Sequence, residues 1–244
     1  MVKNHIKRIN APKRWDILRK ENKFISRPNP GITLDFAVSL NTALKEILGK
    51  TKTTKESKYL IRYKQVLVNG VRRYDEKFPV GFLDVLSLPE SQESYRLIIT
   101  DQNKLAFVKV SDVESKIKIS KVYKKIALAG GKMQVACTDG RNFLMTKEDA
   151  GKVSTNDTIV YSIPDQKVTS ILKFEKGSTV FLYQGKHAGN LVKIEAFDGS
   201  NIMFKEGAET LETRKPYAFV VGKDTPVITM TLGVQPAGGK KAKN

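Results

Sequence analysis

The chain has 244 residues, which at roughly 150 residues per domain suffices for one or two ordinary domains or for several small modules. Its 43 lysines and arginines against 25 aspartates and glutamates give a net charge of +18, which predicts a polyanionic partner, with nucleic acid as the first expectation. The apolar content of 40% is typical of a folded protein, and the apolar runs are far shorter than the roughly 20 residues of a membrane-spanning helix. The amino terminus lacks the apolar core of a signal peptide, so we expect neither a membrane segment nor secretion.

Residues that carry redox, metal or nucleotide chemistry are scarce. Cys137 is the single cysteine, so it has no internal disulfide partner, and His5 and His187 lie too far apart in the sequence for metal-ligand spacing. The glycine pair of residues 129–133 lacks the spacing and the hydroxyl residue of a phosphate-binding loop. We therefore expect no metal, no cofactor and no catalytic residue, and a reducing, cytoplasmic setting.

Residues 1–33 are predicted to form a basic N-terminal arm. The first 30 residues contain nine basic and two acidic side chains, hence +7, with few apolar residues. Such a segment is expected to become ordered only against its partner, with Trp15 favoured as a core anchor over a base-stacking platform. A solvated tail is the alternative. The arm residues predicted to contact RNA are Lys7, Arg8, Lys13, Arg14 and Arg27.

Two helices are predicted next. Apolar residues recur at helical spacing over residues 34–48, with Thr33 as N-cap and Gly49 just beyond the end. The capping-box pattern of Thr53 and Glu56 predicts a second helix over residues 54–65. Its apolar stripe is expected to consist of Tyr59, Leu60 and Tyr63.

A tight hairpin is predicted after the second helix, because Asn69-Gly70 between short apolar runs is typical of a turn with positive φ. Together with a basic stripe on the second helix, this hairpin is predicted to form a path for RNA phosphates, although a basic helix face that is merely solvated remains an alternative. The helices and hairpin are assigned to one small RNA-binding domain, residues 34–94. Its predicted RNA-binding residues are Lys55, Lys58, Arg62, Arg72 and Arg73.

The remainder of the chain is predicted to be almost entirely β, with glycine-containing and aspartate-containing turns. We expect a central β domain over residues 95–173, a small barrel over residues 174–215, and a C-terminal strand and basic tail over residues 216–244. The fold class is therefore α+β with several modules. The predicted strands beyond the hairpin cover residues 82–88, 95–100, 105–110, 118–128, 133–138, 158–163, 168–174, 180–183, 192–196 and 202–204.

The barrel begins with residues 177–190, which resemble a KOW motif in their apolar alternation and glycine-containing turn. This resemblance implies an SH3-like barrel in which Gly189 lets the backbone approach RNA and Lys186 supplies charge. An ordinary β-hairpin is the alternative.

Several strings identify the chain as resembling one family. Residues 5–15 read HIKRINAPKRW, residues 27–31 read RPNPG, and residues 78–85 read FPVGFLDV. With residues 153–159 and 218–223, they resemble the archaeal and eukaryotic small-subunit ribosomal protein S4e family in order and spacing. The helix-helix-hairpin unit also resembles the RNA-binding domain of S4-type ribosomal proteins, pseudouridine synthases and tyrosyl-tRNA synthetases.

The S4e resemblance implies a structural constituent of the small ribosomal subunit, located on ribosomes in the cytoplasm, that binds rRNA and neighbouring ribosomal proteins and takes no small-molecule substrate. An RNA-modifying enzyme or its RNA-binding adaptor is the alternative, although no aspartate stands in the Arg-Leu-Asp context of pseudouridine synthases. A KOW-bearing transcription elongation factor is a third interpretation, which leaves the arm and the helical domain unexplained.

Overall fold

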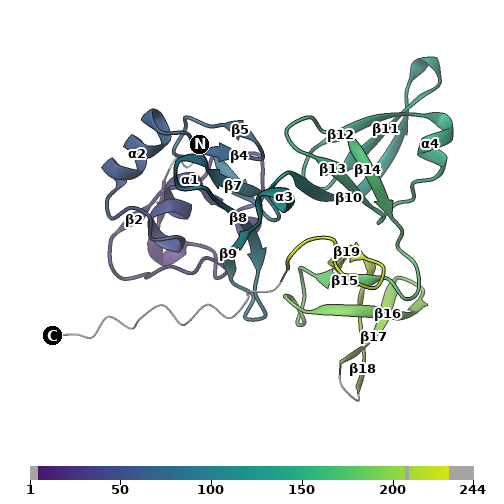
Figure 1. Cartoon of the computed structure of the whole chain (residues 1–244). Coiled ribbons are helices and arrows are strands. Elements are labelled where there is room, and N and C mark those ends of the chain that lie inside the picture. The colour runs from purple at the N-terminus through teal and green to yellow at the C-terminus, as the bar shows by residue number, and fades with distance from the viewer. Residues whose placement is uncertain (1–4, 207–208, 231–244) are drawn as a thin grey trace.

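The computed structural model describes residues 5–206 and 209–230, whose strands form three five-stranded sheets and two two-stranded ones. Figure 1 shows three lobes, with the first 110 residues on the left, the central strands at upper right and the C-terminal strands at lower right. The predicted α+β class with several modules is confirmed at this level. The 3-10 turns cover Arg8–Asn10, Leu34–Phe36, Pro89–Ser91, Ala129–Gly131 and Lys215–Tyr217.

The first five-stranded sheet has the order β5-β4-β7-β8-β9, and all its neighbouring strands are antiparallel. Strands β8 and β9 pair from Ser94↔Val110 to Ile99↔Leu105, and their apolar side chains share one core with the helices. The predicted division between residues 94 and 95 thus falls inside β8. The strands are β4 (Leu67–Val68), β5 (Val71–Arg72), β7 (Val85–Leu88), β8 (Glu93–Ile99) and β9 (Leu105–Val110).

The first predicted helix is wrong in its first half. Residues Ala37–Ser39 form strand β3, which pairs with β6 (Pro79–Gly81), and the helix begins only at α1 (Leu40–Thr42) and continues as a π-helical turn, Ala43–Ile47. The N-cap is Ser39, whose side chain accepts a hydrogen bond from the amide of Thr42, and not Thr33. The buried apolar residues of β3 and of the helix that follows it happen to recur at helical spacing, so the sequence pattern joined the two elements into one predicted helix.

Helix α2 (Thr54–Tyr63) begins with the predicted capping box, in which the Thr53 hydroxyl accepts from the Glu56 amide at 3.2 Å. Its buried face, however, consists of Ser57 and Ile61 and not of the predicted tyrosine stripe. The Ser57 hydroxyl is hydrogen-bonded to Thr51 at 2.7 Å, which satisfies this polar group inside the core. The tyrosines are therefore left for the solvent side of α2.

The predicted hairpin is confirmed, since β4 and β5 pair across Asn69 and Gly70, whose φ values are 52° and 75°. The Asn69 side chain is buried and donates to Asp84 at 2.8 Å while accepting from the Val85 amide at 3.0 Å. The turn is thereby fixed to the next strand of its sheet.

The central sheet has the order β12-β11-β10-β13-β14 and packs a core of its own that includes Val135, Phe143 and Tyr161. Strand β12, in which Phe143 is the one buried residue, and the two short helices, whose residues are mostly polar and exposed, were not predicted. The elements are α3 (Asp112–Ser115), β10 (Ile117–Ala127), β11 (Lys132–Cys137), β12 (Asn142–Thr146), α4 (Lys147–Gly151), β13 (Thr158–Ser162) and β14 (Val168–Leu172).

The third sheet has the order β18-β17-β16-β15-β19, so the predicted C-terminal strand belongs to the barrel-like unit that was expected to end at residue 215. Its inward side chains, among them Val180, Ile194 and Phe204, form a third core. The predicted basic tail beyond residue 230 lies outside the described residues. The strands are β15 (Thr179–Leu182), β16 (Leu191–Asp198), β17 (Asn201–Glu206), β18 (Glu209–Arg214) and β19 (Ala218–Gly222).

Buried lysines of β10 join the lobes. The Lys118 ammonium lies 2.6 Å from Asp84 of the first lobe and 3.4 Å from Asp139 of the central sheet. Lys121 donates to the carbonyls of Lys215, Pro216 and Ala218, at 3.2, 2.9 and 2.7 Å, and so ties the central sheet to the third lobe. Burial lowers the pKa of Lys121 to about 8.

The N-terminal arm packs against the first lobe, which corrects the expectation that it is ordered only by a partner. Strands β1 (Ile6–Lys7) and β2 (Phe24–Ile25) pair with each other, and Trp15 is fully buried in a parallel bridge with Leu105. The Trp15 indole donates to the Leu34 carbonyl at 3.0 Å. A few well-placed apolar anchors therefore suffice to order the described part of the arm, and the prediction of Trp15 as a core residue agrees with this burial.

Candidate nucleic-acid interface

The exposed face of α2 contains Lys55 and Arg62, two of the predicted RNA-binding residues. Neither forms an ion pair within the part of the chain that the structure describes. Lys58, on the same helix, is instead paired with Glu76 at 3.0 Å. Two of the three predicted helix cations thus remain available to phosphate groups.

The hairpin arginines are largely engaged within the protein. Arg72 donates to the carbonyl groups of Arg62 and Lys64 at 3.3 and 3.4 Å, and its guanidinium lies 4.7 Å from the centre of the Tyr74 ring. The Arg73 guanidinium lies 4.4 Å from the centre of the Phe78 ring. These contacts attach the hairpin to the end of α2 and to the next segment, so the five cations do not form one uninterrupted row of free charges.

Arg8 of the arm is buried, with only 1% of its surface exposed. Two of its guanidinium nitrogens lie 2.9 Å from the two carboxylate oxygens of Glu46, and its Nε donates to the Leu18 carbonyl at 2.8 Å. These hydrogen bonds raise the pKa of Arg8 and lower the pKa of Glu46. The predicted RNA contact of Arg8 is therefore wrong, because this side chain holds the arm onto the first helix.

Arg14 also points into the protein. It donates to the Tyr183 carbonyl of the third lobe at 3.2 Å, and its guanidinium lies 4.4 Å from the centre of the Phe36 ring. Burial lowers the pKa of Arg14, although the nearby Asp35 opposes this shift. Arg14 thus links the arm to the third lobe and is only half-exposed.

The exposed cations of the arm are Lys7 and Lys13, together with Lys20 and Lys23. The Lys23 ammonium lies 5.5 Å from the centre of the Phe24 ring. Arg27 is half-buried and takes part in a contact within the protein. The arm therefore presents lysines to solvent, while its arginines are mostly used in packing.

In the KOW-like turn, Lys186 is exposed but Gly189 is not open to a ligand. Gly189 has φ of 100°, and a Cβ added to it would overlap the Thr100 carbonyl and the Asp101 amide of the turn between β8 and β9. The close approach that the structure shows at Gly189 is therefore made to another turn of this protein, whereas the predicted approach was to RNA.

Sequence reasoning missed an aromatic pair on α2. Tyr59 and Tyr63 are 55% and 72% exposed, and their ring centres lie 5.1 Å apart. The sequence contained a signal, because Ser57 and Ile61 form an alternative inward stripe that leaves both tyrosines among Lys55 and Arg62. The tyrosines were assigned to the core because aromatic residues are usually buried there.

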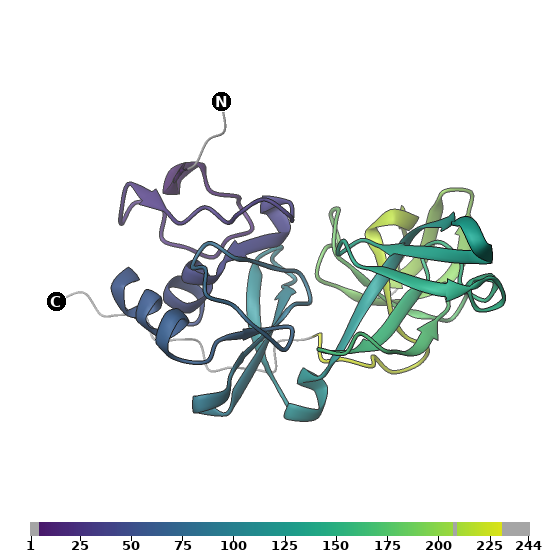
Figure 2. The ribbon, with the colours of Figure 1, turned by 90° about the horizontal axis from the view of Figure 1, so that it is seen from above.

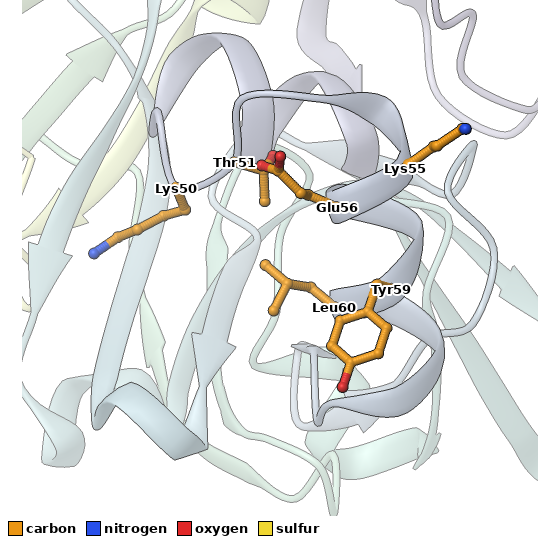
Figure 3. Close-up of a pocket in the computed structure, with 6 residues that line it drawn as sticks. All are labelled: Lys50, Thr51, Lys55, Glu56, Tyr59 and Leu60. Atoms are coloured by element: carbon orange, nitrogen blue, oxygen red, sulfur yellow. The ribbon is translucent and has the colours of Figure 1, made fainter.

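A hollow of about 440 Å³ lies between this face of α2 and the loop before it. Figure 3 shows Leu60 pointing into the hollow beside the Tyr59 ring, with Lys50 and Lys55 extending away on opposite sides. Lys50 is held by Glu93 at 2.5 Å, and this hydrogen bond lowers the pKa of Glu93 to about 2. The floor of the hollow is apolar, and its rim contains Lys55, the paired Lys50 and the carboxylate Glu56.

A larger hollow of about 720 Å³ lies between the first and central lobes, and its lining contains more acidic than basic side chains. It contains the carboxylates Glu93, Asp112 and Asp165 against the single cation Lys116. Acidic linings repel phosphate groups, so this second hollow does not suit a nucleic acid.

Metal-binding clusters are not found in the residues that the structure describes. No group of three His, Cys, Asp or Glu side chains in residues 5–206 and 209–230 is placed to hold a metal ion. Burial raises the pKa of Cys137 to about 12, which keeps this thiol protonated at neutral pH. Within the same residues, no helix is both long and apolar enough to cross a membrane.

Comparison with known proteins gives two family matches. Residues 91–168 match the family described as "Ribosomal family S4e", and residues 2–31 match the "RS4NT (NUC023) domain". The small ribosomal subunit protein eS4 of Methanococcus aeolicus is 33% identical over 240 residues, which cover 93% of this chain and 98% of that protein. The corresponding protein of Methanocaldococcus jannaschii is 34% identical over the same length and coverage.

The fold is also similar to a solved structure. The crystal structure of the 30S ribosomal protein S4e from Thermoplasma acidophilum superposes with a TM-score of 0.66 at 25% sequence identity. The match covers 80% of this chain and 98% of that one.

Proposed function

Because the chain belongs to the S4e family of ribosomal proteins, we propose that the exposed cations of α2 and of the arm bind rRNA phosphates in the small ribosomal subunit. The chain is a structural constituent of that subunit, supports translation and is not an enzyme. The alternative of an RNA-modifying enzyme is therefore wrong. The elongation-factor interpretation is set aside because relatives named as ribosomal proteins match 93% of the chain.

The exposure of Lys55 and Arg62 on one face of α2, without carboxylate partners, is the observation that carries this assignment of the RNA-binding face. A lysine or arginine that is already paired inside the protein adds little free energy of RNA binding. An unpaired exposed cation neutralises an RNA phosphate and releases the counterions condensed on the RNA, which favours binding. We extend the proposed contact to Lys7, Lys13 and Lys186, which are exposed as well. Arg27 is retained as a lesser contact because it is half-buried.

The partners and the compartment follow from this function. We propose that the chain lies on ribosomes in the cytoplasm, between small-subunit rRNA and neighbouring ribosomal proteins. The strand order and positive-φ turn of the third lobe support a KOW-like unit, in which Lys186 and not Gly189 faces the RNA.

The test compares two double variants of equal charge change. Lys55→Glu/Arg62→Glu alters the proposed face, and Lys147→Glu/Lys167→Glu alters two exposed lysines of the central lobe that likewise form no ion pair within the described residues. Binding to purified small-subunit rRNA is measured against salt concentration. The α2 variant should weaken binding strongly and flatten the slope of log affinity against log salt by about 1.4, since each single-strand phosphate contributes roughly 0.7. Equal losses in the two variants would show that only net charge matters.

A further inference from the structure

We propose that the aromatic pair Tyr59–Tyr63 on α2 is a stacking site for unpaired bases of the RNA, and that a base seated on Tyr59 rests against the hollow beside it. This inference rests on the proposed function and names the form of RNA that α2 takes: single-stranded or looped nucleotides, not the paired duplex.

The exposure of the tyrosines is the first observation. Side chains of this size bury most of their surface in a folded protein, yet more than half of Tyr59 and of Tyr63 faces solvent. Neither ring belongs to any of the three cores. The two adjacent exposed rings, with centres 5.1 Å apart, form an apolar platform on the surface of α2.

The placement of charge on α2 is the second observation. Lys55, Arg62 and Tyr63 each stand three or four residues from Tyr59, so the four side chains lie along one helix face. At a rise of about 1.5 Å per residue, this face runs about 12 Å from its first to its last member. Lys55 precedes the aromatic pair and Arg62 lies between its two tyrosines, and this alternation of cations and rings fits a ligand that alternates phosphates and flat bases.

The hollow is the third observation. Its volume of about 440 Å³ falls in the range of roughly 300–1,000 Å³ that ligand clefts span. Leu60 provides the apolar floor and Tyr59 one wall, as Figure 3 shows, while Glu56 is used at the helix start by its bond to the Lys52 amide at 2.7 Å. Glu56 is the one carboxylate that lines this hollow, and its side chain is directed to the amides at the start of the helix.

Duplex RNA does not satisfy this arrangement. Its bases are stacked inside an A-form helix, and its deep major groove does not admit side chains, whereas unpaired bases in loops and bulges stack readily on aromatic rings. Stacking on one aromatic side chain accounts for a roughly 5- to 100-fold gain in affinity for single strands. An acidic protein segment would match the lysines but would leave the rings without a planar partner.

The experiment uses the full chain and two fluorescently labelled probes, a single-stranded oligouridylate of about 12 nucleotides and a blunt RNA duplex of the same length. The test variant is Tyr59→Ala/Tyr63→Ala, and Tyr59→Phe/Tyr63→Phe retains the rings without the hydroxyl groups. The matched control is Tyr123→Ala, since Tyr123 is 67% exposed on the central lobe. Thermal unfolding is recorded for each variant, and we expect it to be unchanged because the residues are outside the cores.

We expect the alanine variant to lose roughly 5- to 100-fold in affinity for the oligouridylate and less than about 2-fold for the duplex, with the phenylalanine and Tyr123 variants near the wild type. Unchanged oligouridylate binding by the alanine variant, together with weakened binding by Lys55→Glu/Arg62→Glu, would overturn the stacking site and leave the proposed function intact. Unchanged binding by both variants would refute the proposed function itself. An alanine variant that binds both probes normally but no longer enters small subunits would assign the tyrosines to a protein partner and also overturn the inference.

Discussion

Replacing Arg8 with methionine should detach the N-terminal arm from the first lobe while the rest of the protein stays folded. Arg8 makes a bidentate pair with Glu46, with both nitrogen-to-oxygen distances at 2.9 Å, and a third hydrogen bond to the Leu18 carbonyl. Methionine keeps much of the aliphatic volume but removes all three donors. The Glu46 carboxylate then loses its principal partner in a site where its side chain is only 12% exposed.

The expected cost is about 3 kcal/mol. Removing one partner of a buried pair costs roughly 3–5 kcal/mol because the other charge is left uncompensated. The lower end applies because Lys45 lies 3.4 Å from Glu46 and because some solvent reaches the carboxylate. At about 1.4 kcal/mol per factor of ten, this loss raises the population of the detached arm roughly 100-fold.

Trp15 is the assay. It is the single tryptophan of the chain and is fully buried in the docked arm, so its fluorescence emission reports arm docking alone. In urea, the wild-type Trp15 signal and the far-ultraviolet circular dichroism signal should change together. In the Arg8→Met variant, the Trp15 emission should shift to the red at lower urea than the circular dichroism transition. The control is Lys7→Met, which removes an exposed neighbouring charge and should change stability by less than about 0.5 kcal/mol.

The same pair fixes the pH at which the arm detaches. The pKa of Glu46 is held below its usual value by its hydrogen bonds to Arg8, against an opposing effect of burial. Its contribution to stability is therefore complete above the ordinary glutamate pKa of about 4.3 and is lost as the pH falls through the lowered value. Wild-type Trp15 emission should stay unshifted at pH 5 and move to the red in more acidic solution. If the Arg8→Met and Lys7→Met variants give the same Trp15 transitions, Arg8 does not hold the arm.

Three other substitutions test the joints between the lobes. Lys118→Met should destabilise the protein by roughly 3–5 kcal/mol in urea unfolding, because it leaves the buried Asp84 and the half-buried Asp139 without their shared cation, and a second substitution Asp84→Asn should restore part of the loss. Gly189→Ala should cost about 2–4 kcal/mol through overlap with the Thr100 turn, whereas Gly199→Ala, also at positive φ but in open space, should cost only about 1–2 kcal/mol by thermal unfolding. The stability of the wild type relative to Lys121→Met should grow by about 2 kcal/mol between pH 8 and 10, since the folded state loses the Lys121 proton near pH 8 while the unfolded chain keeps it. A stability difference independent of pH would contradict the lowered pKa.

Local patterns predicted those elements whose signals lie within a few residues. The capping box of Thr53 and Glu56, the Asn69-Gly70 turn and most strands beyond residue 95 appear where alternation and turn chemistry placed them. The first helix failed because Val38 is buried by a strand that arrives forty residues later, and helical spacing cannot report that pairing. The order of the sheets likewise depends on contacts between distant segments.

The candidate site was predictable in its charge but not in its geometry. Composition indicated a polyanionic partner, and family resemblance indicated which one, but neither distinguishes Arg8, buried against Glu46, from Lys7, its exposed neighbour. Gly189 illustrates the same limit, since a glycine kept for close approach does not reveal whether protein or RNA approaches it. The exposed tyrosines were missed because one of the two buried residues of α2 is Ser57. A polar residue does not mark the buried face in a search for apolar periodicity.

The bridge between Trp15 and Leu105 means that the arm cannot dock fully until the segment around Leu105 has been synthesised. The arm is made first, but the strand that covers Trp15 is made about 90 residues later, which at 5–20 residues per second corresponds to roughly 5–20 seconds. The Tyr183 carbonyl, which accepts a hydrogen bond from Arg14, is synthesised later still, because it is 169 residues further along the chain. Until residue 105 has been made, the positively charged arm therefore lacks the strand partner that bridges to Trp15 in the folded protein.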